Sequence, residues 1–181
     1  MKIVGIVQAR MGSTRFPGKV MKKIVGKPMI ELLLERLSKS AELDEIVVAT
    51  SDAVENDKLQ FFVESIGYRC TRGSEKNVLD RYYESAKQIK ADVIVRITAD
   101  CPLIDPKLVD ECIKNFKKSN VDYFSNVDPR TYPDGLDISV MSFSSLERAN
   151  NEAVSEYDKE HVTTFIRNSK KFTKSSLKYN C

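Results

Sequence analysis

A loop rich in positively charged and hydroxyl side chains follows the first apolar run of the sequence. After "KIVGIV" the chain reads "QARMGSTRFPGK", with guanidinium groups from Arg10 and Arg15, the Lys19 ammonium, and hydroxyls from Ser13 and Thr14. Guanidinium forks bind phosphate oxygens in a bidentate manner, and a lysine adds a compact charge. This set of donors predicts a polyphosphate site, and the alternative is a solvated basic turn.

Two common nucleotide-binding motifs do not account for this loop. A P-loop has four residues between its glycines and a hydroxyl residue after its lysine. Here five residues separate Gly12 from Gly18, and Val20 follows Lys19. The sequence also lacks G-x-G-x-x-G, so the dinucleotide fingerprint is absent. Gly12 still allows the backbone to approach a ligand closely.

A carboxylate follows the most apolar run of the sequence. In "VIVRITADCP", Asp100 comes directly after that run. A carboxylate faces triphosphate oxygens only with a cation between them, so this position implies Mg²⁺. The alternative is that Asp100 caps a turn before Pro102. Asp105 is interpreted instead as the N-cap of the next helix, with Pro106 at its first position.

Two later segments offer further polar side chains. In "YPDGLDISV", Asp134 and Asp137 flank Gly135. They either contact the hydroxyls of an acceptor or a second metal, or they form a hairpin turn, because Asp-Gly is a turn signal. His161 is interpreted as a packed group one turn before Phe165 on a helix, with contact to substrate as the alternative.

Short apolar runs alternate with segments of helical period along the chain. Strands are predicted at 2–7, 45–50, 68–71 and 92–98, and helices at 28–40, 58–67, 77–89, 105–119, 143–150 and 156–167. This alternation predicts an α/β fold, with a mostly parallel Rossmann-like sheet covered by helices on both faces. Ligands bind beyond the carboxyl ends of such strands, so four polar loops are expected to converge there.

The composition limits the partners and the compartment. The 181 residues carry a net charge of only +3, with acids and bases mixed, which argues against nucleic acid as a partner. No apolar run is long enough to span a membrane, and "QAR" follows the first run where a signal peptide would have a cleavage site. Four cysteines without metal spacing are expected to be reduced thiols of a cytoplasmic protein.

Six ordered blocks of the sequence resemble a known family. They are "IVQARMGSTRFPGKVM", "VVATSD", "RGSEKNVLDRYYE", "VRITADCPLIDP", "YPDGLDISVMS" and "EHVTTFIR". Together they are similar to the cytidylyltransferases that include the spore-coat polysaccharide enzyme and the synthetases that load CMP onto acidic sugars. The similarity runs from the first predicted strand to about Arg167.

The resemblance implies the nucleotide-diphospho-sugar transferase type of α/β fold and a reaction. CTP, with Mg²⁺, would pass its cytidylyl group to a small-molecule acceptor and release pyrophosphate, for surface polysaccharide biosynthesis. The implied catalytic residues are Arg10, Lys19 and Asp100, and the implied metal ligands are Asp100 and Asp137. The implied nucleotide-binding residues are Ala9, Arg10, Ser13, Arg15, Lys19, Thr50, Ser51, Asp52, Arg72, Gly73, Ser74, Asp80 and Arg81. The acceptor would contact Asp134, Asp137 and His161.

One departure from the family pattern leaves alternatives open. Relatives that load CMP onto sugars continue with a strand and an acidic run that completes the metal site, whereas this chain ends in "SSLKYNC". We therefore expect residues 1–181 to be a single domain that lacks a C-terminal segment, or Asp137 to replace the missing aspartate. The alternative functions are a sugar-1-phosphate nucleotidyltransferase that uses another nucleotide, and a nucleotide-binding module without turnover. The region 121–160 is a candidate surface for a homodimer.

Overall fold

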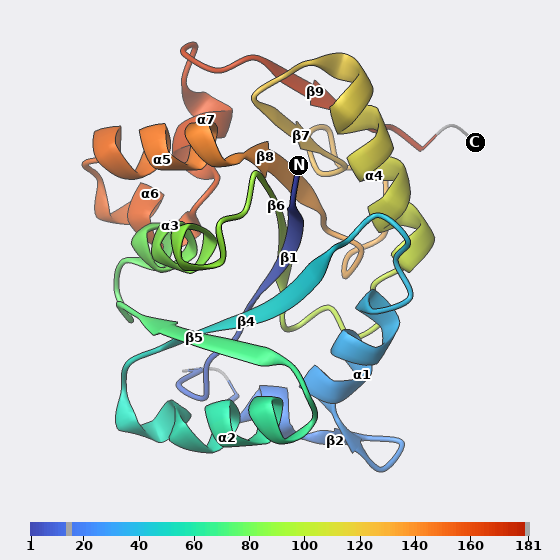
Figure 1. Ribbon diagram of the computed structural model, residues 1–181, viewed down its shortest axis with the longest axis vertical. Helices are drawn as coiled ribbons and strands as arrows, with labels where there is room; N and C mark the ends of the chain where they lie inside the picture. The colour runs from blue at the N-terminus through green and yellow to red at the C-terminus, as the bar shows by residue number, and fades with distance from the viewer. Residues whose placement is uncertain (14–15, 180–181) are drawn as a thin grey trace.

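A mostly parallel sheet forms the centre of the molecule, as the sequence predicts. The computed structural model describes residues 1–13 and 16–179. Within that part, seven strands form a sheet in the order β5-β4-β1-β6-β8-β7-β9 (Figure 1). Its strands are β1 (Ile3–Gln8), β4 (Glu45–Ser51), β5 (Arg69–Gly73), β6 (Val93–Thr98), β7 (Tyr123–Ser125), β8 (Ser139–Ser142) and β9 (Lys174–Ser176).

The register of the central strands brings the ends of β1 and β6 together. These two strands run parallel, with Gly5 opposite Val95 and Gln8 opposite Thr98. β4 and β5 continue the parallel half, whereas β8 runs antiparallel to both β6 and β7. Because parallel strands end at one edge, the loops after β1, β4, β5 and β6 open on the same side.

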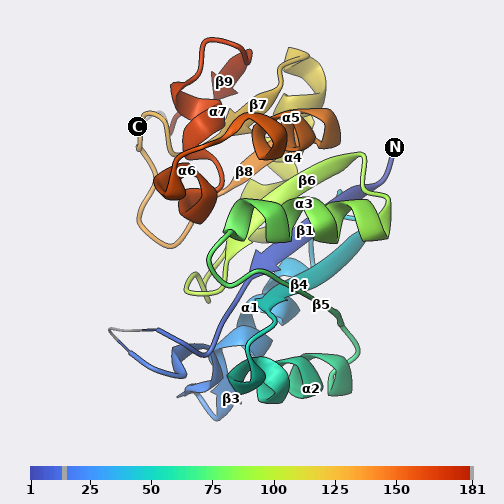
Figure 2. The ribbon, with the colours of Figure 1, turned by 90° about the vertical axis from the view of Figure 1, so that its left-hand side faces the viewer.

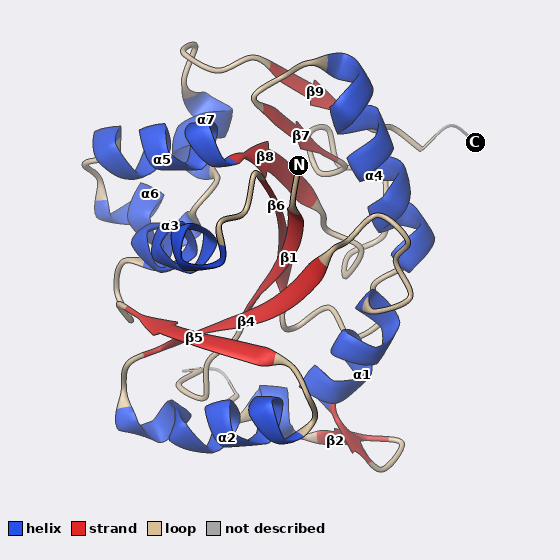
Figure 3. Cartoon of the chain, viewed as in Figure 1, coloured by secondary structure: helices blue, strands red, loops and turns tan. Residues whose placement is uncertain are grey.

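Helices cover both faces of the sheet, which explains why its central strands are apolar on both sides. The helices are α1 (Met29–Leu37), α2 (Asp57–Ser65), α3 (Val78–Ile89), α4 (Pro106–Ser119), α5 (Phe143–Glu152), α6 (Glu156–His161) and α7 (Thr164–Asn168). Figure 3 shows α1 and α4 on one side of the red strands and α3 and α5 on the other. Within the described residues, no helix combines the length and apolar character needed to cross a bilayer.

Local signals account for the ends of several helices. Asp105 is the N-cap of α4, as predicted, since its carboxylate accepts a hydrogen bond from the Lys107 amide at 2.9 Å. Gly67, with a φ of 87°, follows the end of α2. A short hairpin of β2 (Lys23–Ile24) and β3 (Lys27–Pro28), which the sequence analysis does not anticipate, precedes α1.

The single helix predicted over 156–167 is wrong. Two helices, α6 and α7, occupy this region, and Val162 between them has φ 60° and ψ −58°. The Thr163 amide donates to the His161 carbonyl at 2.6 Å, so these residues form a γ-turn. Val162 is fully buried, which indicates that packing against the core holds this strained backbone.

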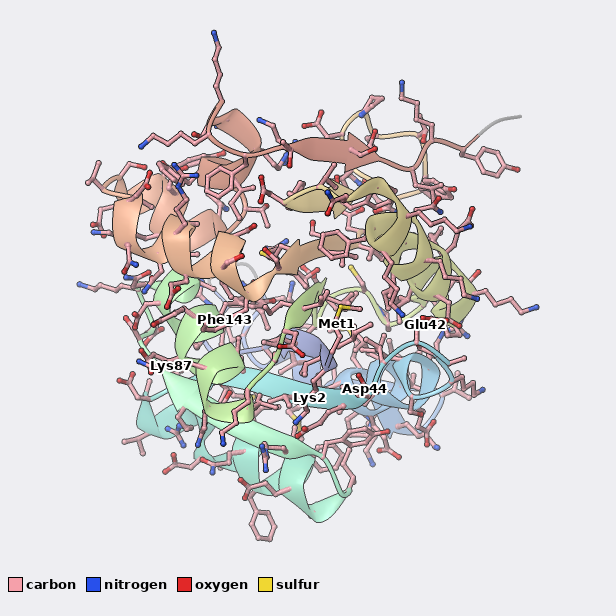
Figure 4. The ribbon with its side chains drawn as sticks, turned by 45° about the horizontal axis from the view of Figure 1, so that its top comes forward. Met1, Lys2, Glu42, Asp44, Lys87 and Phe143 are labelled. Atoms are coloured by element: carbon pink, nitrogen blue, oxygen red, sulfur yellow. The ribbon has the colours of Figure 1, made fainter. Side chains whose placement is uncertain are left out.

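The two edges of the sheet differ in how their polar groups are used. At the amino edge, Asp44 accepts the Ile3 amide at 2.7 Å and Lys2 lies 2.7 Å from Glu45; Figure 4 labels Lys2 and Asp44 there. These groups stabilise strand ends. At the opposite edge, the loop after β1 and helix α6 both project to the left in Figure 2, away from the N-terminus. The candidate site lies at this carboxyl edge.

Candidate nucleotide-binding site

A cavity of about 300 Å³ opens where β1 and β6 end. Its lining is Gln8, Ala9, Arg10, Ser13, Lys19, Val20, Thr98, Ala99, Asp100 and Glu160. The cavity thus joins the basic first loop to the carboxylate that follows β6, as the sequence analysis predicts. Gln8, Val20, Thr98, Ala99 and Glu160 were not among the predicted site residues.

Lys19 and Asp100 form an ion pair across this cavity. The Lys19 Nζ atom lies 3.0 Å from Asp100 Oδ2, and both side chains are partly exposed. Burial raises the pKa of Asp100, but hydrogen bonds from Lys19 and Thr98 outweigh burial and hold the pKa below its ordinary value. Asp100 is therefore an ionised carboxylate at neutral pH.

The first loop is anchored to the end of β4. The Met11 amide donates to Asn56 Oδ1 at 2.8 Å, and Asn56 Nδ2 donates to Ser51 Oγ at 2.7 Å. The Gly18 amide donates a hydrogen bond to the Met11 carbonyl at 2.9 Å, and this bond closes the loop just before Lys19. Ser51, predicted to contact the nucleotide, thus supports the loop through Asn56, a buried residue that no motif signalled.

Gly12 has the carboxylate of Glu55 as its neighbour. A Cβ atom at this position would contact that carboxylate, which is the end of an exposed side chain. Arg15, with Thr14, lies outside the described residues.

Arg10 connects the first cavity to a second one. Its guanidinium lies 3.8 Å from Glu75 Oε1. The second cavity, of about 510 Å³, is lined by Arg10, Glu75, Lys76, Glu156 and Glu160. Because Arg10 and Glu160 line both cavities, the two are neighbours over the same edge.

The predicted nucleotide-binding arginines of β5 and α3 donate hydrogen bonds to other residues of the chain. The Arg72 guanidinium donates to Asp57 at 2.6 Å and to Gln60 at 2.9 Å, both on α2. Arg81 is 1% exposed, and its Nη1 atom donates to the Ser74 carbonyl at 2.9 Å. Burial lowers the pKa of the Arg81 guanidinium, and its Nε atom has no partner in the described part of the chain.

The remaining predicted nucleotide-binding residues surround these arginines. Thr50 is fully buried, and its hydroxyl has no partner among residues 1–13 and 16–179. Asp52 is exposed, and its amide donates to the Gly73 carbonyl at 2.9 Å. A Cβ atom at Gly73 would lie 3.1 Å from Arg81 Cγ, so a glycine at this position allows the Arg81 side chain to pack closely against β5. Asp80 accepts from Asn150 Nδ2 at 3.3 Å.

The predicted acceptor carboxylates are held by Arg130. The two guanidinium nitrogens of Arg130 donate to the two oxygens of Asp137, each at 2.8 Å, and Arg130 also bonds to Asp134. Asp137 is close enough to Cys101, in the loop after β6, to affect its thiol: burial raises the pKa of Cys101 most, and the charges of Asp100 and Asp137 raise it further. Asp137 thus lies near the loop after β6, and both of its carboxylate oxygens accept hydrogen bonds from Arg130.

His161 lies apart from the cavities. Its ring is exposed, and the ring centroid is 4.3 Å from that of Tyr157. The γ-turn at Val162 ends α6 at His161, so the prediction that His161 is a packed group on the same helix as Phe165 is wrong. The neighbouring residue in "EHVTTFIR", Glu160, lines both cavities instead.

The donor set of the first cavity fits Mg²⁺. Among residues 1–13 and 16–179, no group of three or more histidine, cysteine, aspartate or glutamate side chains has the geometry to hold a metal alone. Mg²⁺ commonly binds through one or two carboxylates and completes its shell with water and substrate phosphates. The ionised Asp100 carboxylate, with cationic phosphate-binding groups in the same cavity, meets that requirement.

Comparison with known proteins identifies the family. The sequence model of a family described as cytidylyltransferase matches residues 4–179. The chain belongs to the cytidylyltransferase family. It is therefore a nucleotidyltransferase, and the resemblance of its six sequence blocks is confirmed.

Three proteins illustrate the likeness of this cytidylyltransferase to others. The spore coat polysaccharide biosynthesis protein SpsF of Bacillus subtilis is 36% identical over 171 residues, which cover 92% of this chain and 70% of SpsF. The 3-deoxy-manno-octulosonate cytidylyltransferase of Geobacter metallireducens is 41% identical over 115 residues, which cover 62% of this chain and 44% of that protein. The structure of a cytidylyltransferase from Leptospira borgpetersenii superposes with a TM-score of 0.94 at 33% identity, covering 99% of this chain and 77% of that one.

Proposed function

We propose that this chain transfers the cytidylyl group of CTP to a hydroxyl of a sugar acid, or to the phosphate of a phosphorylated acceptor, and releases pyrophosphate. One observation carries the proposal: Arg10, Ser13 and Lys19 share a cavity with the ionised Asp100. The acceptor class is supported by the relatives, since one is a 3-deoxy-manno-octulosonate cytidylyltransferase and another a spore coat polysaccharide protein. We further propose the cytoplasm as the compartment and surface polysaccharide as the destination of the product.

The residues of the cavity divide the work of phosphoryl transfer. The acceptor oxygen, whose proton passes to water when the acceptor group is a hydroxyl, bonds to the α-phosphorus. The bond between the α-phosphorus and the oxygen that bridges to the β-phosphate breaks, and pyrophosphate leaves, so alignment and charge neutralisation matter most. Arg10 and Lys19 would bind the oxygens of the triphosphate and stabilise the departing pyrophosphate. Asp100 would hold Mg²⁺, which when bound supplies positive charge next to the reacting phosphate.

Thermal stability and pyrophosphate release test this proposal. With Mg²⁺ present, CTP should raise the melting temperature more than UTP, GTP or ATP at equal concentration, because a ligand of the folded state stabilises it by RT ln(1 + [L]/Kd), which is larger for the ligand that binds more tightly. An equal response to UTP or GTP would favour the sugar-1-phosphate nucleotidyltransferase instead. CTP binding without pyrophosphate release from any acceptor would favour a nucleotide-binding module.

Two aspartates of the same loop provide a matched pair of variants. Asp100→Asn should lower pyrophosphate release by about 100-fold or more, because a neutral amide binds Mg²⁺ weakly. Asp105→Asn should leave it unchanged, because Asp105 caps α4 and asparagine is an equally good cap. Unchanged turnover in Asp100→Asn would contradict the proposed metal role.

A further inference from the structure

An arginine without a carboxylate partner lies beneath the candidate site. Arg96 is on β6, and its side chain shares a face of the sheet with Ile94, toward α3 and α5. Within the described residues it makes no ion pair, and its side-chain hydrogen bond runs from Nη2 to Gln8 Oε1 at 3.4 Å. Its Nε atom is buried and has no partner there. The residue as a whole is half-buried, and its one long hydrogen bond to Gln8 leaves the positive charge and the buried Nε donor without an anionic partner. A buried donor without an acceptor is costly, so an absent partner is expected.

Serine hydroxyls continue from Arg96 across the sheet. Ser139 on β8 pairs with Arg96, Ser125 on β7 pairs with Ser139, and Ser176 on β9 pairs with Ser125. Ser125 is 1% exposed, and its hydroxyl is a second buried polar atom without a partner in the described part of the chain. Neighbouring strands are about 4.8 Å apart, and Arg96 and Ser125 are separated by two such spacings, so a molecule about 10 Å long, such as an eight-carbon sugar acid, spans the distance between them.

This row of side chains begins beside the cavity at the end of β1 and β6. Gln8, which accepts the Arg96 hydrogen bond, lines the cavity that holds Lys19 and Asp100. The row then extends away from the first loop, from β6 toward β9. The first loop supplies its own cations for the triphosphate, so Arg96 is placed for a different anion.

We propose that Arg96 binds the anionic group of the acceptor, a carboxylate or a phosphate, and that the Ser125 hydroxyl hydrogen-bonds to the same molecule. The inference rests on the proposed function and adds the residues that select the acceptor. A carboxylate or phosphate offers two oxygens at the spacing of the Nε and Nη donors, and it compensates the charge that the protein leaves unpaired. Arg96 is thus a specificity-determining residue.

Calorimetric binding and steady-state kinetics with CTP and Mg²⁺ test the inference. The probes are 3-deoxy-manno-octulosonate, its uncharged methyl ester, and glycerol phosphate; the acid and the phosphate distinguish the two sources of the anion. The parent chain should bind one of the two anionic probes and, where that probe is the acid, bind it more tightly than its ester. Arg96→Gln should weaken binding of that probe at least tenfold, remove any preference for the acid over its ester, and change the KM for CTP less than twofold.

Two further variants separate binding from folding. Ser125→Ala removes a hydroxyl without a protein partner in the described residues, so it should fold normally and weaken the same probe two- to fivefold. Arg69→Gln, at an exposed position on β5, is the control and should change nothing. Equal affinities of the parent and Arg96→Gln, a parent that binds neither anion, or an equal loss for CTP would overturn the inference. Failure of CTP to bind the parent contradicts the proposed function instead.

Discussion

The two halves of the sheet build their share of the carboxyl edge in different ways. From β5 to β6 the strands are parallel and regular helices connect them, so each polar loop reaches the edge by the geometry of the fold. From β8 to β9 the strands pair in both antiparallel and parallel directions. Here single local contacts fix the polar groups near the edge: Arg130 binds Asp137, and the turn at Val162 ends α6. We call the half from β5 to β6, which carries the proposed nucleotide site, the nucleotide half, and the half from β8 to β9, which carries the proposed acceptor contacts, the acceptor half. The nucleotide half is specified by topology, and the acceptor half by particular contacts.

The largest expected effect belongs to the nucleotide half. Lys19→Met should lower kcat/KM for CTP by about 100-fold, because it removes a cation from the cavity that would stabilise the departing pyrophosphate. The stability of the fold should hardly change, because the pair with Asp100 is partly exposed and such pairs contribute little. Steady-state kinetics and urea denaturation measure the two quantities.

Lys22→Met is the matched control for this prediction. Lys22 lies on the same segment, and its ammonium is 5.6 Å from the centre of the Phe16 ring rather than in the cavity. A loss in Lys22→Met as large as that in Lys19→Met would show that only the overall charge of the segment matters.

The difference between the halves also decides what the sequence could predict. Strand–helix alternation and the Asp105 cap are local signals, and the structure confirms them up to α4. Arg10, Lys19 and Asp100 follow strand ends, so they were predicted to converge and do. The break after α6 had no local signal, because valine ordinarily avoids a positive φ and only burial in the core holds Val162 there.

The same reasoning explains the site residues that were missed or placed elsewhere. Glu160 reaches the cavity because the helix ends one residue later, a consequence of the turn rather than of its own neighbours. Arg72 was assigned to the nucleotide from its motif, but its guanidinium donates to Asp57 and Gln60. Partners on another helix cannot be predicted from the spacing within one motif.

Val162 offers the next largest effect and tests whether strain positions α6. Val162→Ala should lower the free energy of unfolding by about 2 kcal/mol, because a fully buried valine loses its packing. Val162→Gly should be no less stable than the alanine variant, although glycine normally costs about 1 kcal/mol more than alanine. The reason is that φ of 60° favours glycine. Urea denaturation of both variants measures the order, and a glycine variant clearly below alanine would contradict the strain.

Arg130 allows a smaller test, of whether Asp137 belongs to the metal site. Arg130→Gln should raise the apparent affinity for divalent cations about threefold if Asp137 is a metal ligand, because its two carboxylate oxygens lose a competing cation. Titration with Mn²⁺, used as a paramagnetic substitute for Mg²⁺, measures the affinity of the site by electron paramagnetic resonance without turnover. Arg148→Gln, which removes an exposed pair with Glu152 on α5, is the control. Unchanged affinity in Arg130→Gln would exclude Asp137 from the metal site.

The smallest effect concerns a second valine with a positive φ, and it sharpens the contrast with Val162. Val25, at the tip of the β2–β3 hairpin, has φ 50° and is 96% exposed, so no burial offsets its strain. Val25→Asn creates an Asn-Gly pair with Gly26, which suits a hairpin turn with two positive φ values. We expect a gain of about 0.5–1 kcal/mol in the free energy of unfolding. Val154→Asn, at an exposed valine outside the positive-φ region, should give no gain. Equal gains in the two variants would mean that replacing an exposed valine by a polar residue raises the stability, rather than relief of backbone strain, and Val162 would then need another explanation too.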